Sequence, residues 1–166
     1  MDTRDLYPHE ILQEAIGKSC AKSEFSIKML VILSFLGGGY VGFGYLACLR
    51  VISGIPAEWN GLAALLGASV FPIALICILI GGGELATGNM MIMALGRLTG
   101  RVSTYKQVRN WLIVSLGNLA GAVAMAYFLG HYVGLAEGPA TAKTIAIAEA
   151  KVNMDFGRAF VSAIAI

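Results

Sequence analysis

The residue types that could do chemistry gather in one short stretch, Gly81–Asn89. It contains three successive glycines, the Glu84 carboxylate and the Thr87 hydroxyl. Glycine disfavours helix, so a helix that begins after the glycines would point its unsatisfied N–H groups at whatever lies beside Thr87. Such a helix start attracts anions, and a hydroxyl there can cap the helix and donate to a passing ion. The stretch therefore predicts an anion site on interrupted backbone.

The sequence around this stretch predicts that it lies inside a membrane. Between Asn60 and Gly96 the only charged residue is Glu84. One helix of that length would run about 55 Å, against a hydrocarbon core of about 30 Å, and two crossings would need about 40 residues plus a turn. One crossing built from two half-helices, at about 62–80 and 87–98, fits better. Non-helical backbone at membrane depth is tolerated where it lines a water-filled cavity, so the break predicts a transport site.

Glu84 needs a compensating partner at that depth, because an unpaired carboxylate inside a membrane is costly. We expect it to be neutral, or to be held by backbone amides of the loop and of the following helix start. Gly88 and Asn89 would complete this structural element. A direct role in relaying protons is the alternative. A charged carboxylate facing the pathway would repel an anion unless its charge were screened.

The composition indicates a membrane protein. Of 166 residues, 57% are hydrophobic and only 13% are charged, against about 25% charged in a soluble domain. The mean hydropathy is +0.75. The basic residues are scattered, which argues against nucleic-acid binding. The cysteines form no C-x-x-C pair and the two histidines lie far apart, so we expect no metal, no cofactor and no enzyme active site.

The chain divides into a cytoplasmic amphipathic helix within residues 1–26 and a transmembrane channel domain at 27–166. Pro8 suits a first helical position, and apolar residues then recur on one face, opposite Lys18 and Lys22. We expect this helix to be an interfacial anchor or, alternatively, to gate a pore entrance. In the channel domain the first crossing spans about 29–49 and the third about 110–135. The predicted fold class is thus an all-α polytopic membrane protein.

Basic residues set the expected orientation. The loop after the broken crossing holds four bases and no acid within 13 residues: Arg97, Arg101, Lys106 and Arg109. Under the positive-inside rule this loop, and with it the N-terminus, is cytoplasmic. Residues 136–155 then form an outer loop of mixed charge. A fourth apolar run opens at Phe156 and reaches only Ile166, so we expect the sequence to be a fragment of a longer protein, truncated within the fourth crossing.

Small residues predict close helix packing. Gly38 and Gly42 form a G-x-x-x-G step in the first crossing, which lets two backbones approach closely. Asn118 lies in a second small-residue step in the third crossing, where an amide commonly hydrogen-bonds between helices. Phe71 and Leu75 share a helix face at i, i+4, and either pack against neighbours or narrow a pore wall.

Two motifs carry a resemblance to a known family. The segments 83–89 (Gly-Glu-Leu-Ala-Thr-Gly-Asn) and 117–122 (Gly-Asn-Leu-Ala-Gly-Ala), with Gly100-Arg101 and Asn110-Trp111-Leu112, resemble the formate/nitrite transporter family, which includes hydrosulfide channels. The resemblance runs over essentially the whole chain. It implies an aquaporin-like bundle of six membrane helices in two inverted three-helix repeats, assembled as a homopentamer of independent pores. This chain would supply the first repeat and the start of the second.

The resemblance also implies that six residues line the substrate pathway: Phe71, Leu75, Leu85, Ala86, Thr87 and Lys151. The first two would form a hydrophobic constriction. The next three match the loop that lines the central chamber, with the threonine donating a hydrogen bond to the substrate. The lysine would draw anions into the outer vestibule. Family members commonly carry phenylalanine in place of Ala86, so this constriction would be wider here, and the family's central histidine is not part of this sequence.

The expected function is a channel or transporter that passes small monovalent anions of weak acids (formate, nitrite or hydrosulfide) across a cell inner membrane. Two alternatives stay open: a proton-coupled active transporter of the same anions, and a water or polyol channel. The Asn-Pro-Ala triplet of aquaporin half-helices does not occur in the sequence. A non-transporting anchor subunit of a redox complex would show cofactor ligands, and none is evident.

Overall fold

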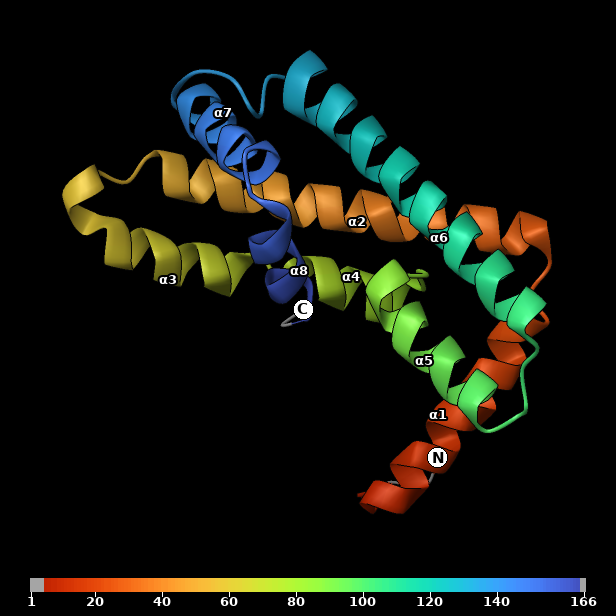
Figure 1. Cartoon of the computed structure of the whole chain (residues 1–166). Helices are drawn as coiled ribbons and strands as arrows, with labels where there is room; N and C mark the ends of the chain where they lie inside the picture. Colours follow the sequence, from red (N-terminus) through yellow and green to blue (C-terminus); the bar gives the residue numbers. More distant parts are fainter. Residues whose placement is uncertain (1–4, 165–166) are drawn as a thin grey trace. The chain divides into compact units, whose positions relative to one another are not determined.

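The computed structural model describes residues 5–164 of the 166-residue chain, and most of them are helical (Figure 1). In chain order the elements are α1 (Pro8–Ser23), α2 (Ile27–Ser53), the short 3-10 helix η1 (Ala57–Trp59), α3 (Asn60–Val70), α4 (Ile73–Gly81), α5 (Ala86–Leu98), α6 (Thr104–Met125), the π-helix η2 (Ala126–Tyr132), α7 (Pro139–Val152) and α8 (Phe156–Ile164). The chain forms two compact units: residues up to 38 with 82–120, and residues 39–81 with 121 onward.

Three helical stretches are long and apolar enough to cross a membrane. They are Ile27–Ser53, Ala57–Gly81 and Thr104–Tyr132, with 27, 25 and 29 residues. At about 1.5 Å per residue each exceeds a hydrocarbon core of about 30 Å. The three spans fall where the sequence placed its first crossing, the first arm of the broken crossing, and its third crossing.

The second span is longer than its predicted counterpart, because helical structure already begins at Ala57. Its 25 residues can therefore cross a membrane without the help of α5. The interpretation of residues 60–96 as one crossing made of two half-helices is not required by length and stays a proposal. Within this span Phe71 and Pro72 form a turn between α3 and α4, since a proline inside a helix lacks an N–H donor and clashes with the preceding turn.

In the first unit, α1 lies against α5, and the beginnings of α2 and α6 pack together (Figure 1). Glycines set the distance between α2 and α6. A Cβ built at Gly38 of α2 would overlap the backbone of Asn118 in α6, and one at Gly117 would overlap the Ser34 side chain. The close packing predicted for these two steps is confirmed.

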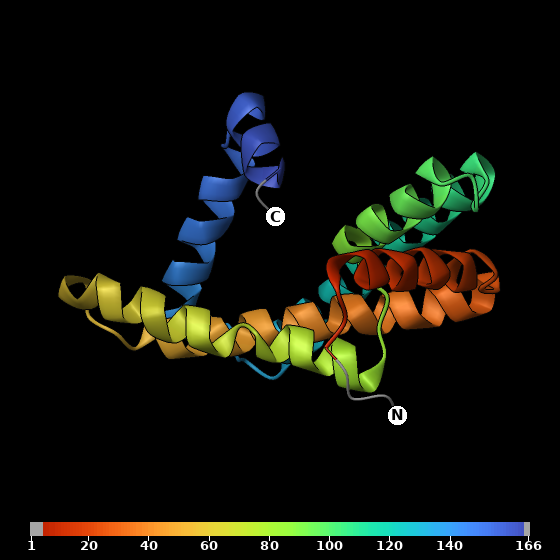
Figure 2. The same ribbon diagram turned by 90° about the horizontal axis from the view of Figure 1, so that it is seen from below.

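In the second unit, α3 and α4 run beside the later half of α2 (Figures 1 and 2). Gly44 of α2 faces Ala74 of α4, which is fully buried. Gly42 faces the Cβ of Met125 at the end of α6, where an added Cβ would lie 2.9 Å away. Both glycines of the predicted G-x-x-x-G step thus lie at close helix contacts, each within its own unit.

The prediction of an outer loop at 136–155 is wrong over most of its length, because residues Pro139–Val152 form α7. Gly138 takes φ +66°, Pro139 occupies the first turn, and alanine recurs through the segment. Proline at the first helical position and alanine in the interior both favour helix, and this local preference outweighs the mixed charges that suggested a loop. The apolar run at Phe156 is also helical, as α8.

Replacing Gly38 by alanine should destabilise the protein by about 1–3 kcal/mol, because the new methyl group would overlap the Asn118 backbone. Gly17→Ala in α1 is the matched control. A Cβ there meets nothing within 4 Å, and alanine favours helix over glycine by about 0.5–1 kcal/mol. Thermal unfolding of the full-length protein in detergent measures both variants, and equal stability of the two would contradict the close packing.

Candidate functional site

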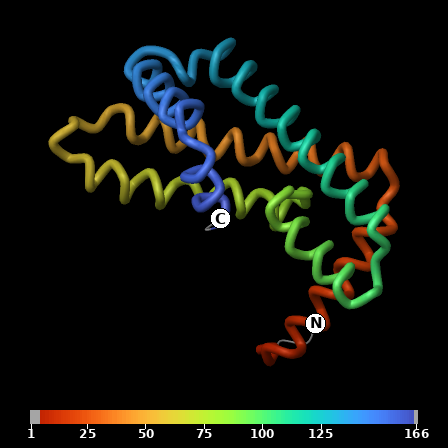
Figure 3. Tube along the Cα trace, in the orientation of Figure 1, coloured from red at the N-terminus to blue at the C-terminus, as the bar shows by residue number. Residues whose placement is uncertain are grey.

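The stretch singled out in the sequence contains non-helical backbone. α4 ends at Gly81 and α5 begins at Ala86, one residue before the expected start (Figure 3). Gly82 has a φ of +75°, a left-handed conformation that only glycine adopts readily. Helix termination at the glycines therefore has a local cause. Residues 83–89 are held in place by groups on helices that are distant in the sequence.

Asn118 of α6 binds the non-helical backbone from two sides. Its Oδ1 accepts from the Ala86 N–H at 2.8 Å, and its Nδ2 donates to the Glu84 carbonyl at 2.8 Å. The same Nδ2 donates to the Ser34 carbonyl of α2 at 2.7 Å. The Glu84 N–H in turn donates to the Leu33 carbonyl at 3.0 Å. Asn118 therefore bonds between helices, as predicted, and it satisfies backbone groups that a helix break would otherwise leave unpaired.

The Glu84 carboxylate is buried, with the whole residue 6% exposed. Lys22 Nζ of α1 lies 2.5 Å from Glu84 Oε1, and Asn89 Nδ2 donates to Oε2 at 2.6 Å. Lys22 also donates to Asn89 Oδ1 at 3.0 Å, which closes a three-membered ring of contacts. An ammonium and an amide thus supply the hydrogen bonds that bulk water would give to an exposed carboxylate.

This arrangement corrects the expectation that backbone amides hold Glu84. Side chains hold it instead, and the partner that the sequence did not suggest is Lys22, which lies 62 residues earlier. Lys22 was placed on the polar side of an interfacial helix. The available signal was a single acid in a long apolar stretch, which requires a base from elsewhere in the chain.

Two of the segments that carry the family resemblance, 83–89 and 110–112, meet at Asn89, which is 2% exposed. Its Nδ2 donates to Asn110 Oδ1 at 2.9 Å, and the Trp111 indole N–H donates to the Asn89 carbonyl at 3.2 Å. Asn110 is itself fully buried. Consecutive residues of α6 therefore fix the first turn of α5, which is why the segments 83–89 and 110–112 act as one structural element.

Thr87 lies on the exposed side of the α5 start, next to the exposed Gly88. The N-cap of α5 is Leu85, without a side-chain hydrogen bond, so the expected capping role of Thr87 is wrong. Thr87 lies two positions after the N-cap, too far into the helix for its hydroxyl to act as a cap. Leu85 and Ala86 are half-buried beside it. The first turn of α5 thus presents a hydroxyl and backbone N–H groups that have no intrahelical acceptor.

The remaining predicted pathway residues belong to the second unit. Phe71 and Leu75 are 37% and 47% exposed, and the Phe71 ring packs edge-on against Tyr45 at 6.4 Å between centroids. Lys151 is exposed in the last turn of α7. Leu85, Ala86 and Thr87 lie in the first unit, so the six residues are not assembled into one described site.

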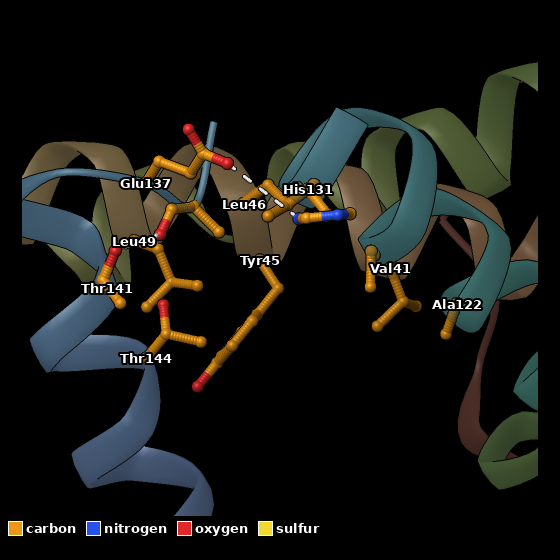
Figure 4. A pocket seen from close by; sticks show the side chains of 13 residues that line it. Val41, Tyr45, Leu46, Leu49, Ala122, His131, Glu137, Thr141 and Thr144 are labelled. Atoms are coloured by element: carbon orange, nitrogen blue, oxygen red, sulfur yellow. Dashed lines mark hydrogen bonds and ion pairs between the residues drawn. The ribbon is translucent and has the colours of Figure 1, made fainter. Parts of the chain in front are cut away.

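A cavity of about 660 Å³, which the sequence did not predict, lies within the second unit (Figure 4). Its lining comes from α2, the end of α6, the π-helix, α7 and the loop before α7, and is mostly apolar. Tyr45 points into it, and His131 and Glu137 lie at its edge with 3.9 Å between Nδ1 and Oε1. Among residues 5–164 no group of three His, Cys, Asp or Glu side chains could hold a metal ion.

Comparisons with known proteins agree on one family. Residues 9–165 match the family model described as formate/nitrite transporter. The chain is 45% identical over 158 residues to an uncharacterized transporter, YrhG, of Bacillus subtilis, covering 95% of this chain and 59% of that protein. It is 36% identical over 157 residues to the formate channel BtFdhC of Bacillus thuringiensis, covering 95% and 61%. A probable formate transporter of Methanothermobacter thermautotrophicus is 38% identical over 143 residues, covering 81% and 52%.

A solved structure described as an FNT family ion channel has a similar fold. The TM-score is 0.69 with 25% identity, over 76% of this chain and 50% of that one. The chain thus spans about three fifths of the length of the first two curated relatives.

Replacing Lys22 by methionine should destabilise the full-length protein by about 3 kcal/mol or more, because the buried Glu84 carboxylate would lose its counterion. Lys18→Met removes an exposed charge from the same helix and should have little effect. Adding Glu84→Gln to Lys22→Met should recover part of the loss, since no charge then stays buried. Thermal unfolding in detergent checks all three, and equal loss in the two single variants would contradict the pairing.

Proposed function

This chain belongs to the formate/nitrite transporter family, and on that premise we propose that the whole protein passes small monovalent anions of weak acids across a membrane. Formate, nitrite and hydrosulfide are the candidate substrates. The observation that carries the proposal is the anchored non-helical backbone at 82–85, which leaves Thr87 exposed at the start of α5. Two relatives are named as a formate channel and a probable formate transporter, which favours formate.

The proposed pathway uses three kinds of group in succession. Lys151, exposed on α7, raises the anion concentration at the outer entrance. Phe71 and Leu75, exposed on one face of the second span, form an apolar constriction that strips water and disfavours charge, so the conjugate acid crosses more easily. Thr87 and the first amides of α5 then replace the lost hydration. Leu85 and Ala86 complete the chamber wall beside Thr87.

The proposed architecture follows from the same resemblance. We propose that α3, α4 and α5 form one interrupted crossing, that α2 to α6 make up the first of two inverted repeats, and that the protein assembles as a homopentamer in the inner membrane. The N-terminus and the basic loop after α5 face the cytoplasm. In this arrangement α1 lies at the cytoplasmic side of the first repeat.

Thr87→Ala should lower formate flux about tenfold, because one hydrogen bond to the dehydrated substrate is worth about 1–1.5 kcal/mol. Thr87→Ser should retain most of the flux, since it keeps the hydroxyl. Thr99→Ala, at the other end of the same helix, is the matched control. Flux of the full-length variants in proteoliposomes, driven by a formate gradient, is the measurement. Wild-type flux in Thr87→Ala would remove Thr87 from the pathway.

Ala86→Phe should narrow the chamber and reduce passage of larger acids more than of formate. Ala86 is half-buried beside Thr87 in the first turn of α5, at the chamber wall proposed above. The ratio of acetate to formate flux in proteoliposomes should fall, while Gly88→Ala, where a Cβ meets nothing within 4 Å, should leave it unchanged. An unchanged ratio in Ala86→Phe would place Ala86 outside the pore wall.

The same assay separates the alternatives. Flux that persists without a pH gradient and follows the formate gradient indicates a passive channel. Flux that requires a proton gradient across the membrane indicates a proton-coupled transporter. Osmotic swelling in glycerol without anion flux would indicate a water or polyol channel and would overturn the proposal.

A further inference from the structure

A basic pocket lies at the connection between α5 and α6. Its volume is about 560 Å³, and it is lined by Arg97, Gly100, Arg101, Val102, Ser103, Thr104 and Lys106. Three of these seven residues are cationic, none is acidic, and two carry hydroxyl groups. The pathway proposed above uses none of them. Their chemistry is that of a site for a phosphate group, which accepts hydrogen bonds and carries negative charge.

The backbone of this connection is fixed rather than loose. The N–H groups of Arg101 and Val102 both donate to the Gly96 carbonyl, at 2.9 and 3.0 Å. Gly100 takes φ +72°, which closes this helix end as glycine commonly does. Val102 is 3% exposed and contacts Gly96, so the loop is pinned to the body of the unit. A preformed loop positions its side chains at little cost in conformational entropy.

The two arginines are the groups that remain to hold an anion. Arg97 Nε donates to the Thr104 hydroxyl at 2.7 Å, and this bond holds the guanidinium across the connection. The two terminal nitrogens of the guanidinium take no part in that bond. Arg101 is exposed at the pocket. Lys106 already pairs with Glu24, and this ammonium lowers the pKa of the Glu24 carboxyl.

The position of the pocket indicates which phosphate it meets. The third candidate span begins at Thr104, so the pocket lies at the end of a helix that is long and apolar enough to cross a membrane, where lipid headgroups would meet it. Leu98 and Tyr105 each adjoin a lining residue in the sequence, and both side chains are mostly exposed, at 83% and 76%. An apolar side chain and a tyrosine beside basic groups suit the boundary between acyl chains and headgroups. A soluble phosphate would make no use of them.

We propose that this pocket binds the headgroup phosphate of an anionic phospholipid, with Arg97 and Arg101 as its ligands. Phosphatidylglycerol fits because its phosphate carries an uncompensated charge, whereas the choline of phosphatidylcholine would meet two guanidinium groups. The inference needs the chain to lie in a membrane but does not depend on which anion the pore conducts.

Native mass spectrometry of the full-length protein, released from detergent after titration with phosphatidylglycerol or phosphatidylcholine, tests the proposal. Arg101→Gln should weaken phosphatidylglycerol binding about fivefold, as expected for one basic residue at an anionic surface. Because the Arg101 side chain is exposed, its loss leaves the fold intact. Lys28→Gln, an exposed base at the start of α2 that does not line this pocket, is the matched control and should bind as wild type.

Three results would overturn the proposal. Equal affinity for the two lipids would show that the pocket does not distinguish the charge of the headgroup. An equal loss in Lys28→Gln and Arg101→Gln would show diffuse attraction rather than a site. Displacement of the bound lipid by millimolar inorganic phosphate would identify free phosphate as the ligand. Preference for phosphatidylglycerol that is lost in Arg101→Gln, kept in Lys28→Gln and insensitive to phosphate supports it.

Discussion

The first unit of this protein depends on one buried charge, the carboxylate of Glu84. Its side chain is 7% exposed, and in apolar surroundings such a group must be paired or neutral. Its partner in the structure is Lys22 of α1, in the N-terminal part of the chain. That requirement brings α1 onto α5, where Ser19 packs against Gly96. The helix expected to lie along the membrane surface is therefore also a structural part of the unit, because it delivers a counterion.

The second constraint is that backbone which leaves a helix must still be hydrogen-bonded. Water does this on a protein surface, but in a membrane-spanning protein other groups of the protein must do it, here the Asn118 side chain and the Leu33 carbonyl. Asn118 supplies both a donor and an acceptor to residues 84–86. An amide side chain is short, so its helix must approach closely, and Gly38 makes that approach possible by having no Cβ to meet the Asn118 backbone. The small residues of these helices thus allow the close approach that the polar side chains need for their hydrogen bonds.

The sequence was informative about elements and poor about partners. Apolar runs located the spans, because the length of a membrane crossing is fixed by the bilayer, and glycines located the non-helical connection between α4 and α5. α7 was missed because alanine-rich helix propensity outweighed the charges of the segment 139–152. The Lys22–Glu84 pair was missed because two residues 62 positions apart leave no periodic signal. The π-helix at Ala126–Tyr132 has no simple composition, so nothing in the sequence distinguished it from the α-helix that it continues.

The pairing of Glu84 also bears on why a carboxylate can stand close to the proposed anion site. A unit charge about 8 Å away, at an effective dielectric of about 20, repels an anion by about 2 kcal/mol, which would lower its occupancy roughly thirtyfold. Lys22 places a positive charge directly on the carboxylate, so the field beside Thr87 is that of a dipole rather than of a negative ion. A dipole's field falls off faster with distance, and the positive end of α5 then dominates. The structural role of Glu84 and the proposed passage of anions are compatible because the Lys22 ammonium compensates the carboxylate charge.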